Sequence, residues 1–118
     1  MNFETAVRTV LSKALIFEGR ASRAEFWWWF LAYLITIVFA SGVDALLFGG
    51  MAIAGGLVWL ALLLPNLSVS VRRLHDRGLV GWWVLLMLIP IVGGLILLIL
   101  LAQPGEPGEN AYGPPPLA

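Results

Sequence analysis

The sequence contains no cysteine and only one histidine, His75, among its 118 residues. The missing cysteines exclude disulfides, thiol nucleophiles and zinc–thiolate sites, and one histidine cannot form a multi-histidine metal site. Neither charge is in excess, since the formal net charge is zero, whereas nucleic-acid-binding domains usually carry a strong basic excess. We therefore expect no enzymatic activity, no cofactor, no metal ion and no nucleic-acid partner.

Apolar residues dominate the chain instead. Hydrophobic residues make up 60% of the sequence and charged residues 12%, and the mean hydropathy is +0.92. This composition is too apolar for an ordinary soluble domain, so lipid is the natural solvent for its surface. The length allows one domain at most, and we predict a single membrane domain over residues 1–118.

Three apolar runs are each long enough to cross a bilayer once. They cover residues 26–48, 51–71 and 79–102, and only the first contains a charge, Asp44. A helix needs about 20 residues, at ~1.5 Å per residue, to cross ~30 Å of hydrocarbon. The Gly49-Gly50 pair between the first two runs suits a tight helical hairpin. The sequence thus predicts an all-α membrane protein with three transmembrane helices.

The two ends of the chain complete this prediction. In residues 3–17, apolar side chains recur at spacings of three and four, which predicts an amphipathic helix that Gly19 would end. This helix would either lie in the membrane interface or pack against the spans. Residues 103–118 hold five of the seven prolines, which predicts an extended, Pro- and Gly-rich tail with no core of its own.

The orientation follows from the basic residues, which all fall on one side of a three-span protein. They are Arg8, Lys13, Arg20, Arg23, Arg72, Arg73 and Arg77. The positive-inside rule makes that side cytoplasmic. Tryptophans at 27–29 and 82–83 begin the first and third spans on the same side, at the headgroup level that indole rings prefer. We therefore predict a cytoplasmic N-terminus and a C-terminal tail on the opposite side.

Charged residues at the cytoplasmic end form the candidate interaction site. They are Arg20, Arg23, Glu25, Arg72, Arg73, His75 and Asp76. On a continuing helix, Asp76 lies i+4 from Arg72 and i+3 from Arg73, so local ion pairs are available. We favour a topology signal that stops transfer; the alternatives are an inter-helical ion network or binding to the phosphates of anionic lipid.

Two local patterns in this region carry further expectations. Ser22 and Glu25 have the spacing of a capping box at the start of the first span. The neighbours His75 and Asp76 invite an acid–base interpretation, but adjacent residues do not face each other on a helix. No second histidine or suitably spaced carboxylate completes a catalytic or metal site. We expect no catalysis from this pair.

Polar residues inside the spans are the second group of candidates. Asp44 is the ionisable one, but it lies near the outer end of the first span, where solvation or snorkelling accounts for it. In the second span, Pro65 cannot donate a hydrogen bond to the carbonyl of Ala61, and Asn66 can hydrogen-bond across helices. We favour a kink with a polar inter-helical contact over a substrate site.

Three sequence blocks stand out in order along the chain. They are GRASRAEFW at residues 19–27, SVRRLHDRG at 70–78 with GWW at 81–83, and PGENAYGP at 107–114. Together they resemble a bacterial inner-membrane family, the YhaH-like proteins of domain of unknown function 805. The resemblance implies a small multi-span protein of the bacterial inner membrane, with the tail then periplasmic. It implies no established activity, so no functional residue is carried over from it.

The function that these patterns favour is a membrane-embedded interaction or accessory protein. Its Arg-rich cytoplasmic face would contact anionic lipid headgroups or a partner. A bundle this small buries little polar surface, so we expect association with a second copy or with another membrane protein. The alternative is a small oligomeric transporter or channel that uses Pro65, Asn66 and Asp44.

Overall fold

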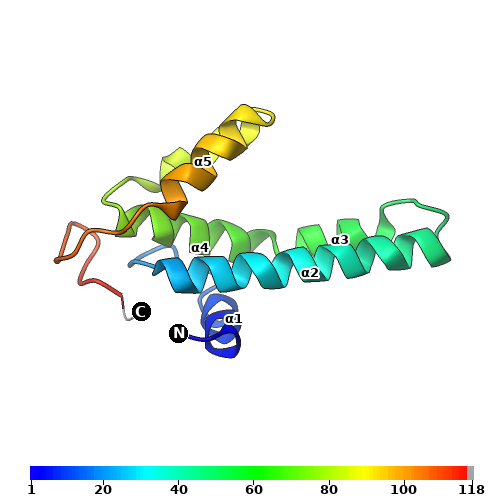
Figure 1. Ribbon diagram of the computed structural model, residues 1–118, viewed down its shortest axis with the longest axis horizontal. Coiled ribbons are helices and arrows are strands. Elements are labelled where there is room, and N and C mark those ends of the chain that lie inside the picture. Colours follow the sequence, from blue (N-terminus) through cyan, green and yellow to red (C-terminus); the bar gives the residue numbers. More distant parts are fainter. Residues whose placement is uncertain (117–118) are drawn as a thin grey trace.

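The computed structural model describes residues 1–116, which form helices joined by short connections (Figure 1). The helices are α1 (Phe3–Ser12), α2 (Arg23–Leu47), α3 (Ile53–Ala61), α4 (Leu63–Asp76), the 3₁₀-helix η1 (Gly81–Leu88) and α5 (Val92–Ala102). Within residues 1–116 there is no β-strand, and the one β-bridge joins Asn110 to Gly113. The predicted all-α fold is confirmed.

The longest feature is a helical hairpin, with α2 on one side and α3 followed by α4 on the other (Figure 1). α2 has 25 residues, about 37 Å at ~1.5 Å per residue. Among the described helices, it alone is long and apolar enough to cross a bilayer unaided, while α3 and α4 qualify as a pair bent by 46°. The turn contains Gly49 and Gly50, both with positive φ, as the predicted hairpin requires.

The bend between α3 and α4 has the cause that the sequence indicated. Pro65 lies in the first turn of α4 and has no N–H to donate to the carbonyl of Ala61. The helix is interrupted at Leu62, and the backbone N–H of Asn66 then donates to the Leu62 carbonyl at 3.0 Å. The predicted kink in the second span is confirmed.

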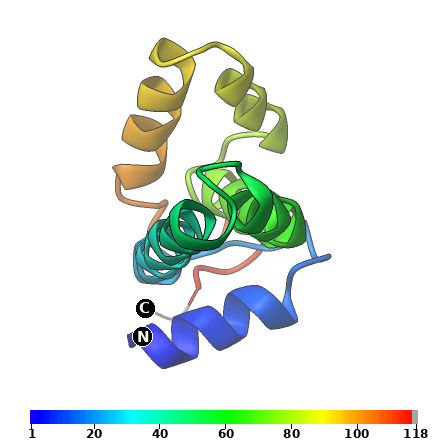
Figure 2. The same cartoon turned by 90° about the vertical axis from the view of Figure 1, so that its right-hand side faces the viewer.

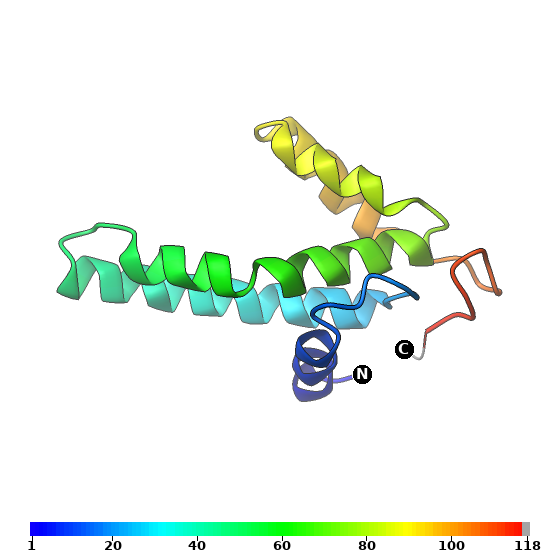
Figure 3. The ribbon, with the colours of Figure 1, turned by 180° about the vertical axis from the view of Figure 1, so that it is seen from behind.

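The third apolar run does not form one continuous transmembrane helix over residues 79–102. Instead, η1 and α5 make a second, shorter hairpin that leaves and rejoins the first near the C-terminal end of α4 (Figures 1 and 3). Pro90, which lacks an N–H, and Ile91, whose φ is +62°, reverse the chain between them. α5 has 11 residues, about 16 Å, or roughly half of the hydrocarbon thickness. The predicted third transmembrane helix is not confirmed, since hydropathy measures the length of an apolar run and not its continuity as a helix.

α1 lies across the long hairpin, crosswise to α2 and α4 (Figure 2). Its inner face, which includes Ala6, is buried, and Phe3 packs edge-to-face against Trp28 with ring centroids 6.0 Å apart. The predicted amphipathic helix is present and packs against the spans, but it ends at Ser12 and is therefore shorter than residues 3–17.

Buried apolar side chains gather at one end of the molecule, where α1, the start of α2 and the ends of α4 and α5 meet. They are Val10, Ala21, Phe26, Trp29, Val69, Leu74, Leu97 and Leu101. At the other end, regular helices expose large apolar side chains such as Phe39 and Leu46, as a lipid-facing surface does. The packed end is also the end that carries the arginines of the candidate site.

Candidate functional site

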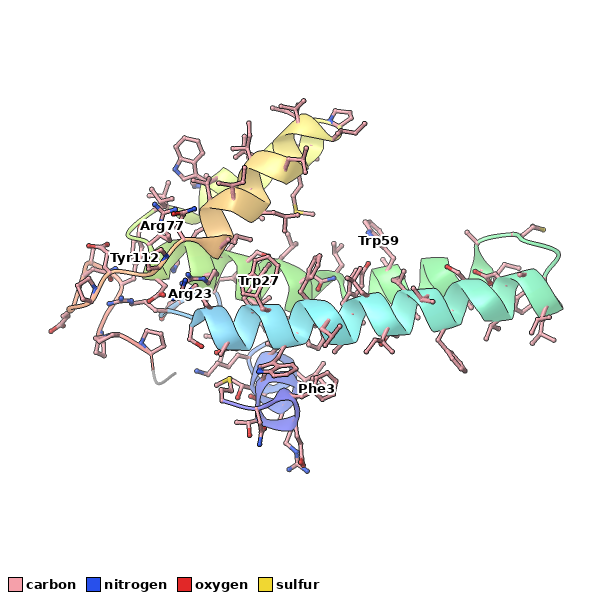
Figure 4. The ribbon with its side chains drawn as sticks, in the orientation of Figure 1. Phe3, Arg23, Trp27, Trp59, Arg77 and Tyr112 are labelled. Carbon is pink, nitrogen blue, oxygen red and sulfur yellow. The ribbon has the colours of Figure 1, made fainter. Side chains whose placement is uncertain are left out.

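The candidate site lies where the start of α2, the ends of α4 and α5, and the tail meet, around the labelled Arg23, Arg77 and Tyr112 (Figure 4). Of the seven candidate interaction residues, Arg23 is exposed and the other six are buried. The buried residues are Arg20, Glu25, Arg72, Arg73, His75 and Asp76. Buried charges are costly unless they are paired and hydrogen-bonded. Their partners therefore decide what this site does.

Asp76 is the centre of the site because its two carboxylate oxygens accept from two arginines. Oδ1 accepts from Arg20 Nε at 2.9 Å, and Oδ2 accepts from Arg73 Nη1. The predicted i,i+3 pair between Arg73 and Asp76 is thus confirmed. The pair with Arg20 joins α4 to the segment that precedes α2, so this carboxylate ties together regions 56 residues apart.

Arg72 pairs with Glu25 of α2 and not with Asp76, one turn away on its own helix. Its Nη1 donates to Glu25 Oε2 at 2.5 Å. Half of the predicted capping box is present, since Ser22 Oγ accepts from the Glu25 backbone N–H at 3.1 Å. The Glu25 carboxylate crosses to α4 and leaves the other half of the box unmade. We call Arg20, Glu25, Arg72, Arg73 and Asp76 the ion-pair network.

Arginines of α4 also bind the C-terminal end of α5. Arg73 Nε donates to the Leu101 carbonyl at 3.0 Å, and Arg77 Nη1 donates to the Leu100 carbonyl at 2.9 Å. The last carbonyls of a helix lack partners within the helix and carry partial negative charge. Two guanidinium groups therefore satisfy these carbonyls and hold the short hairpin at its base.

The tail is bound to the same site. Arg20 Nη1 donates to the Gly108 carbonyl at 2.6 Å, and Asn110 Nδ2 donates to the His75 carbonyl at 2.9 Å. The His75 ring stacks on Tyr112 with centroids 3.9 Å apart. These contacts place the tail at the basic end of the molecule. They correct the prediction that the tail lies on the opposite side, which depended on a third crossing.

Two glycines allow this close approach of the tail. A Cβ at Gly105 would lie 1.9 Å from Asp76 Oδ2, and a Cβ at Gly78 would lie 1.9 Å from Glu106 Oε1. Gly78 also has a φ of +75°, in the left-handed region that favours glycine. A side chain at Gly105 would therefore displace the buried Asp76 carboxylate, whereas at Gly78 the positive φ is the stronger constraint because the exposed Glu106 side chain can move.

The arrangement offers little for acid–base or metal chemistry. Both oxygens of Asp76 are occupied by arginines, and His75 Nδ1 lies 3.1 Å from the Gly19 carbonyl and not beside a carboxylate. Residues 1–116 contain no group of three or more acidic or histidine side chains that could hold a metal ion. Arg20, Arg72 and Arg73 are buried and therefore cannot contact lipid headgroups, whereas Arg23 is exposed.

Asn66 makes the inter-helical contact that the sequence predicted. Its Oδ1 accepts from the indole N–H of Trp29 on α2 at 2.7 Å. Trp29 is a buried core residue, and its indole N–H is bound by the protein.

Asp44 lies at the far end of the long hairpin and is only 5% exposed, so the predicted solvation at the interface is wrong. Its oxygens accept from the backbone N–H groups of Ala54 at 2.6 Å and Gly55 at 2.9 Å. The residue that precedes α3 is Ala52, which has no side chain to cap these groups. Asp44 of α2 thus caps the first turn of α3 from the neighbouring helix.

The contacts that sequence analysis missed are those made by the tail, chiefly by Gly105, Asn110 and Tyr112. The sequence did contain a signal for them. Asn110 and Tyr112 belong to the third block of the family pattern, and Arg20 and His75 belong to the other two. The structure brings all three blocks together in one site.

Comparison with known proteins agrees with this pattern. The family model described as "Protein of unknown function (DUF805)" matches residues 14–114. The chain is 39% identical to "Inner membrane protein YhaH" of Escherichia coli (strain K12) over 111 residues, which cover 91% of this chain and 92% of that protein. It is 35% identical to "Inner membrane protein YhaI" of the same strain over 108 residues, 92% of each. No solved structure matches the chain.

Proposed function

The chain belongs to the DUF805 family, which includes named inner membrane proteins, and on that premise we propose that it is an accessory protein that binds another membrane protein within the bilayer. The binding surface is the turn of the short hairpin, residues 88–91. The ion-pair network and the arginines bound to α5 hold this hairpin in position.

The topology that supports this function has two crossings and one re-entrant hairpin. α2 makes the first crossing, and the bent pair α3–α4 makes the second. The hairpin of η1 and α5 enters the hydrocarbon and returns on the side of the basic residues. By the positive-inside rule that side is cytoplasmic, so both ends of the chain lie in the cytoplasm.

Single cysteines test this topology directly, because the chain has none of its own. We expect Ser12→Cys and Ala111→Cys to react with a membrane-impermeant maleimide from the cytoplasmic side, and Met51→Cys to react from the periplasmic side. All three positions are exposed. If Ala111→Cys instead reacts from the periplasmic side in spheroplasts, the chain makes three full crossings and the re-entrant hairpin is wrong.

The observation that carries the proposed function is the exposed turn of the short hairpin. Leu88, Ile89 and Ile91 are each at least half exposed, and Ile91 is 81% exposed. Pro90 has no N–H, and the N–H of Ile91 makes no hydrogen bond to any residue from 1 to 116. Irregular backbone occurs at membrane depth only where protein or a water-filled cavity covers it. A second polypeptide is therefore expected to cover this turn.

The experiment compares two exposed apolar positions of the same chain. A photoreactive amino acid replaces Ile91 at the turn or Phe39 on α2, which is 75% exposed but lies on a regular helix. In native membranes we expect protein adducts from position 91 and lipid adducts from position 39. The adduct mass then separates a second copy of this chain from a different membrane protein. Lipid adducts alone at both positions would contradict the proposal.

The transporter alternative has less support from these contacts. Asp44 caps α3, and the Oδ1 atom of Asn66 is bonded to Trp29, so each polar side chain suggested for a pathway already has a structural partner. A flux of protons or ions into liposomes that Asn66→Leu abolishes would favour transport over the accessory role.

A further inference from the structure

An apolar groove of about 460 Å³ lies between the two hairpins. The long hairpin lines one wall with Phe30, Tyr33 and Trp59, and the short hairpin lines the other with Met87 and Leu95. Small-molecule sites typically measure about 300–1,000 Å³ and are mostly apolar. The volume of the groove falls within that range.

The groove also contains hydrogen-bond donors that have no acceptor. The indole N–H of Trp59 and the hydroxyl of Tyr33 make no hydrogen bond within the described part of the chain. The amide of Asn66 uses its Oδ1 to accept from Trp29, and its Nδ2 donors stay unpaired in residues 1–116. An unpaired donor in hydrocarbon costs free energy. These donors therefore call for acceptors on the molecule that fills the groove.

The position of Trp59 along the long hairpin indicates which kind of molecule supplies those acceptors. Figure 4 shows Trp59 about midway along the long hairpin, pointing to the side on which the short hairpin rises. Indole rings normally lie at the headgroup level, where acceptors are plentiful. The ester carbonyls of lipids also lie near the headgroup level, whereas the hydrocarbon interior contains no hydrogen-bond acceptors. The acceptor must therefore be carried into the interior by a molecule that dissolves there.

We propose that the groove binds a membrane-soluble molecule with a planar, carbonyl-bearing ring, the chemistry of a prenylated quinone. The donors of Trp59, Tyr33 and Asn66 bind its carbonyl groups. The aromatic rings that line the groove, including Phe30, offer faces for offset stacking on a planar ring. The aliphatic side chains of α5 pack against the prenyl chain. The proposal concerns binding and includes no electron transfer.

The test uses the full-length chain in detergent micelles and a short-chain prenylated benzoquinone with a photoreactive group. We expect saturable labelling that maps to α2 and α3. Trp59→Phe keeps an aromatic ring and removes the N–H, and one lost hydrogen bond of about 1 kcal/mol corresponds to roughly five-fold weaker binding. Tyr33→Phe, a second conservative variant, is expected to weaken binding similarly. Trp82→Phe is the matched control, because Trp82 is 77% exposed and lies outside the groove.

Four results would overturn the proposal. The first is equal affinity for a prenylated benzene that lacks the carbonyls. The second is unchanged affinity in both Trp59→Phe and Tyr33→Phe. The third is protection of the groove from photolabelling by diacylglycerol that equals the protection by the unlabelled quinone. The fourth is occupation of the groove by a second copy of the chain. The first three outcomes do not depend on adducts at Ile91, which also lines the groove, so they test this proposal separately from the accessory function.

Discussion

Two buried aspartates at opposite ends of the long hairpin are stabilised in different ways. Each is only 5% exposed. Asp76 is held by two arginines, Arg20 and Arg73, and lies beside the tail. Asp44 has no basic partner in residues 1–116 and accepts from two backbone N–H groups, those of Ala54 and Gly55. One carboxylate joins distant segments, and the other caps a helix that begins nine residues later, at Ile53.

This difference shows that a buried aspartate can hold distant segments together or can cap a single helix. The bonds of Asp76 connect the segment before α2, the end of α4 and, through the same arginines, the end of α5 and the tail. The bonds of Asp44 affect one helix terminus. Loss of Asp76 should therefore loosen a whole end of the molecule, whereas loss of Asp44 should act locally.

The largest expected effect follows Asp76→Asn. The neutral amide leaves two buried guanidinium groups without their carboxylate, and breaking a buried ion pair in this way costs about 3–5 kcal/mol. We expect a matching loss in the free energy of unfolding in detergent, together with protease cleavage in the tail. Glu109→Gln is the control, because Glu109 is an exposed tail acid. Stability equal to that of Glu109→Gln would show that the network contributes nothing.

A smaller effect is expected from Gly105→Ala, which breaks the tail contact without removing a charge. The added Cβ would lie 1.9 Å from Asp76 Oδ2, and overpacking of this kind costs about 1–3 kcal/mol. Gly108→Ala is the matched control, since a Cβ there meets no atom within 4 Å. Tail protease sensitivity should rise in the first variant alone. An equal response in both would indicate that Gly105 acts through chain flexibility.

The smallest effect is expected from Asp44→Asn. The amide keeps one acceptor for the first turn of α3 but loses the charge, and changes at such caps cost about 0.5–2 kcal/mol. Hydrogen exchange should accelerate at Ala54 and Gly55 and stay unchanged at the basic end. Faster exchange in the tail of this variant would show that the two ends are coupled, contrary to the comparison.

Much of the long hairpin was predictable from the sequence, because its signals are local. The glycine pair at the turn, the missing N–H of Pro65 and the Ser22 cap each act within a few residues of their position. Asn66 was predictable as an inter-helical contact because an amide in a span has few other partners. The partner itself, Trp29, was not predictable, because it depends on how two helices rotate against each other.

The short hairpin and the tail were not predictable for a physical reason. Residues 79–102 are uniformly apolar, so their hydropathy does not indicate that the chain reverses at Pro90 and Ile91. The tail has no basic residue, so the positive-inside rule says nothing about it directly, and its side followed from the number of crossings. The burial of Asp44 was not predictable, because its hydrogen-bond partners are backbone N–H groups, which every residue except proline has.

The bonds of Arg73 have a consequence for how the protein is made. Apart from Asp76, its partners are 28, 30 and 52 residues away: Leu101, Gln103 and Ala21. During synthesis, α4 emerges well before the carbonyls of Leu101 and Gln103, so the guanidinium group of Arg73 lacks these acceptors until residue 103 has been made. A product that stops short of residue 103 lacks at least one of the acceptors of this guanidinium group and leaves this end of the protein incompletely hydrogen-bonded. Hydrogen bonding at this end of the protein is thus completed only after α5 has been made.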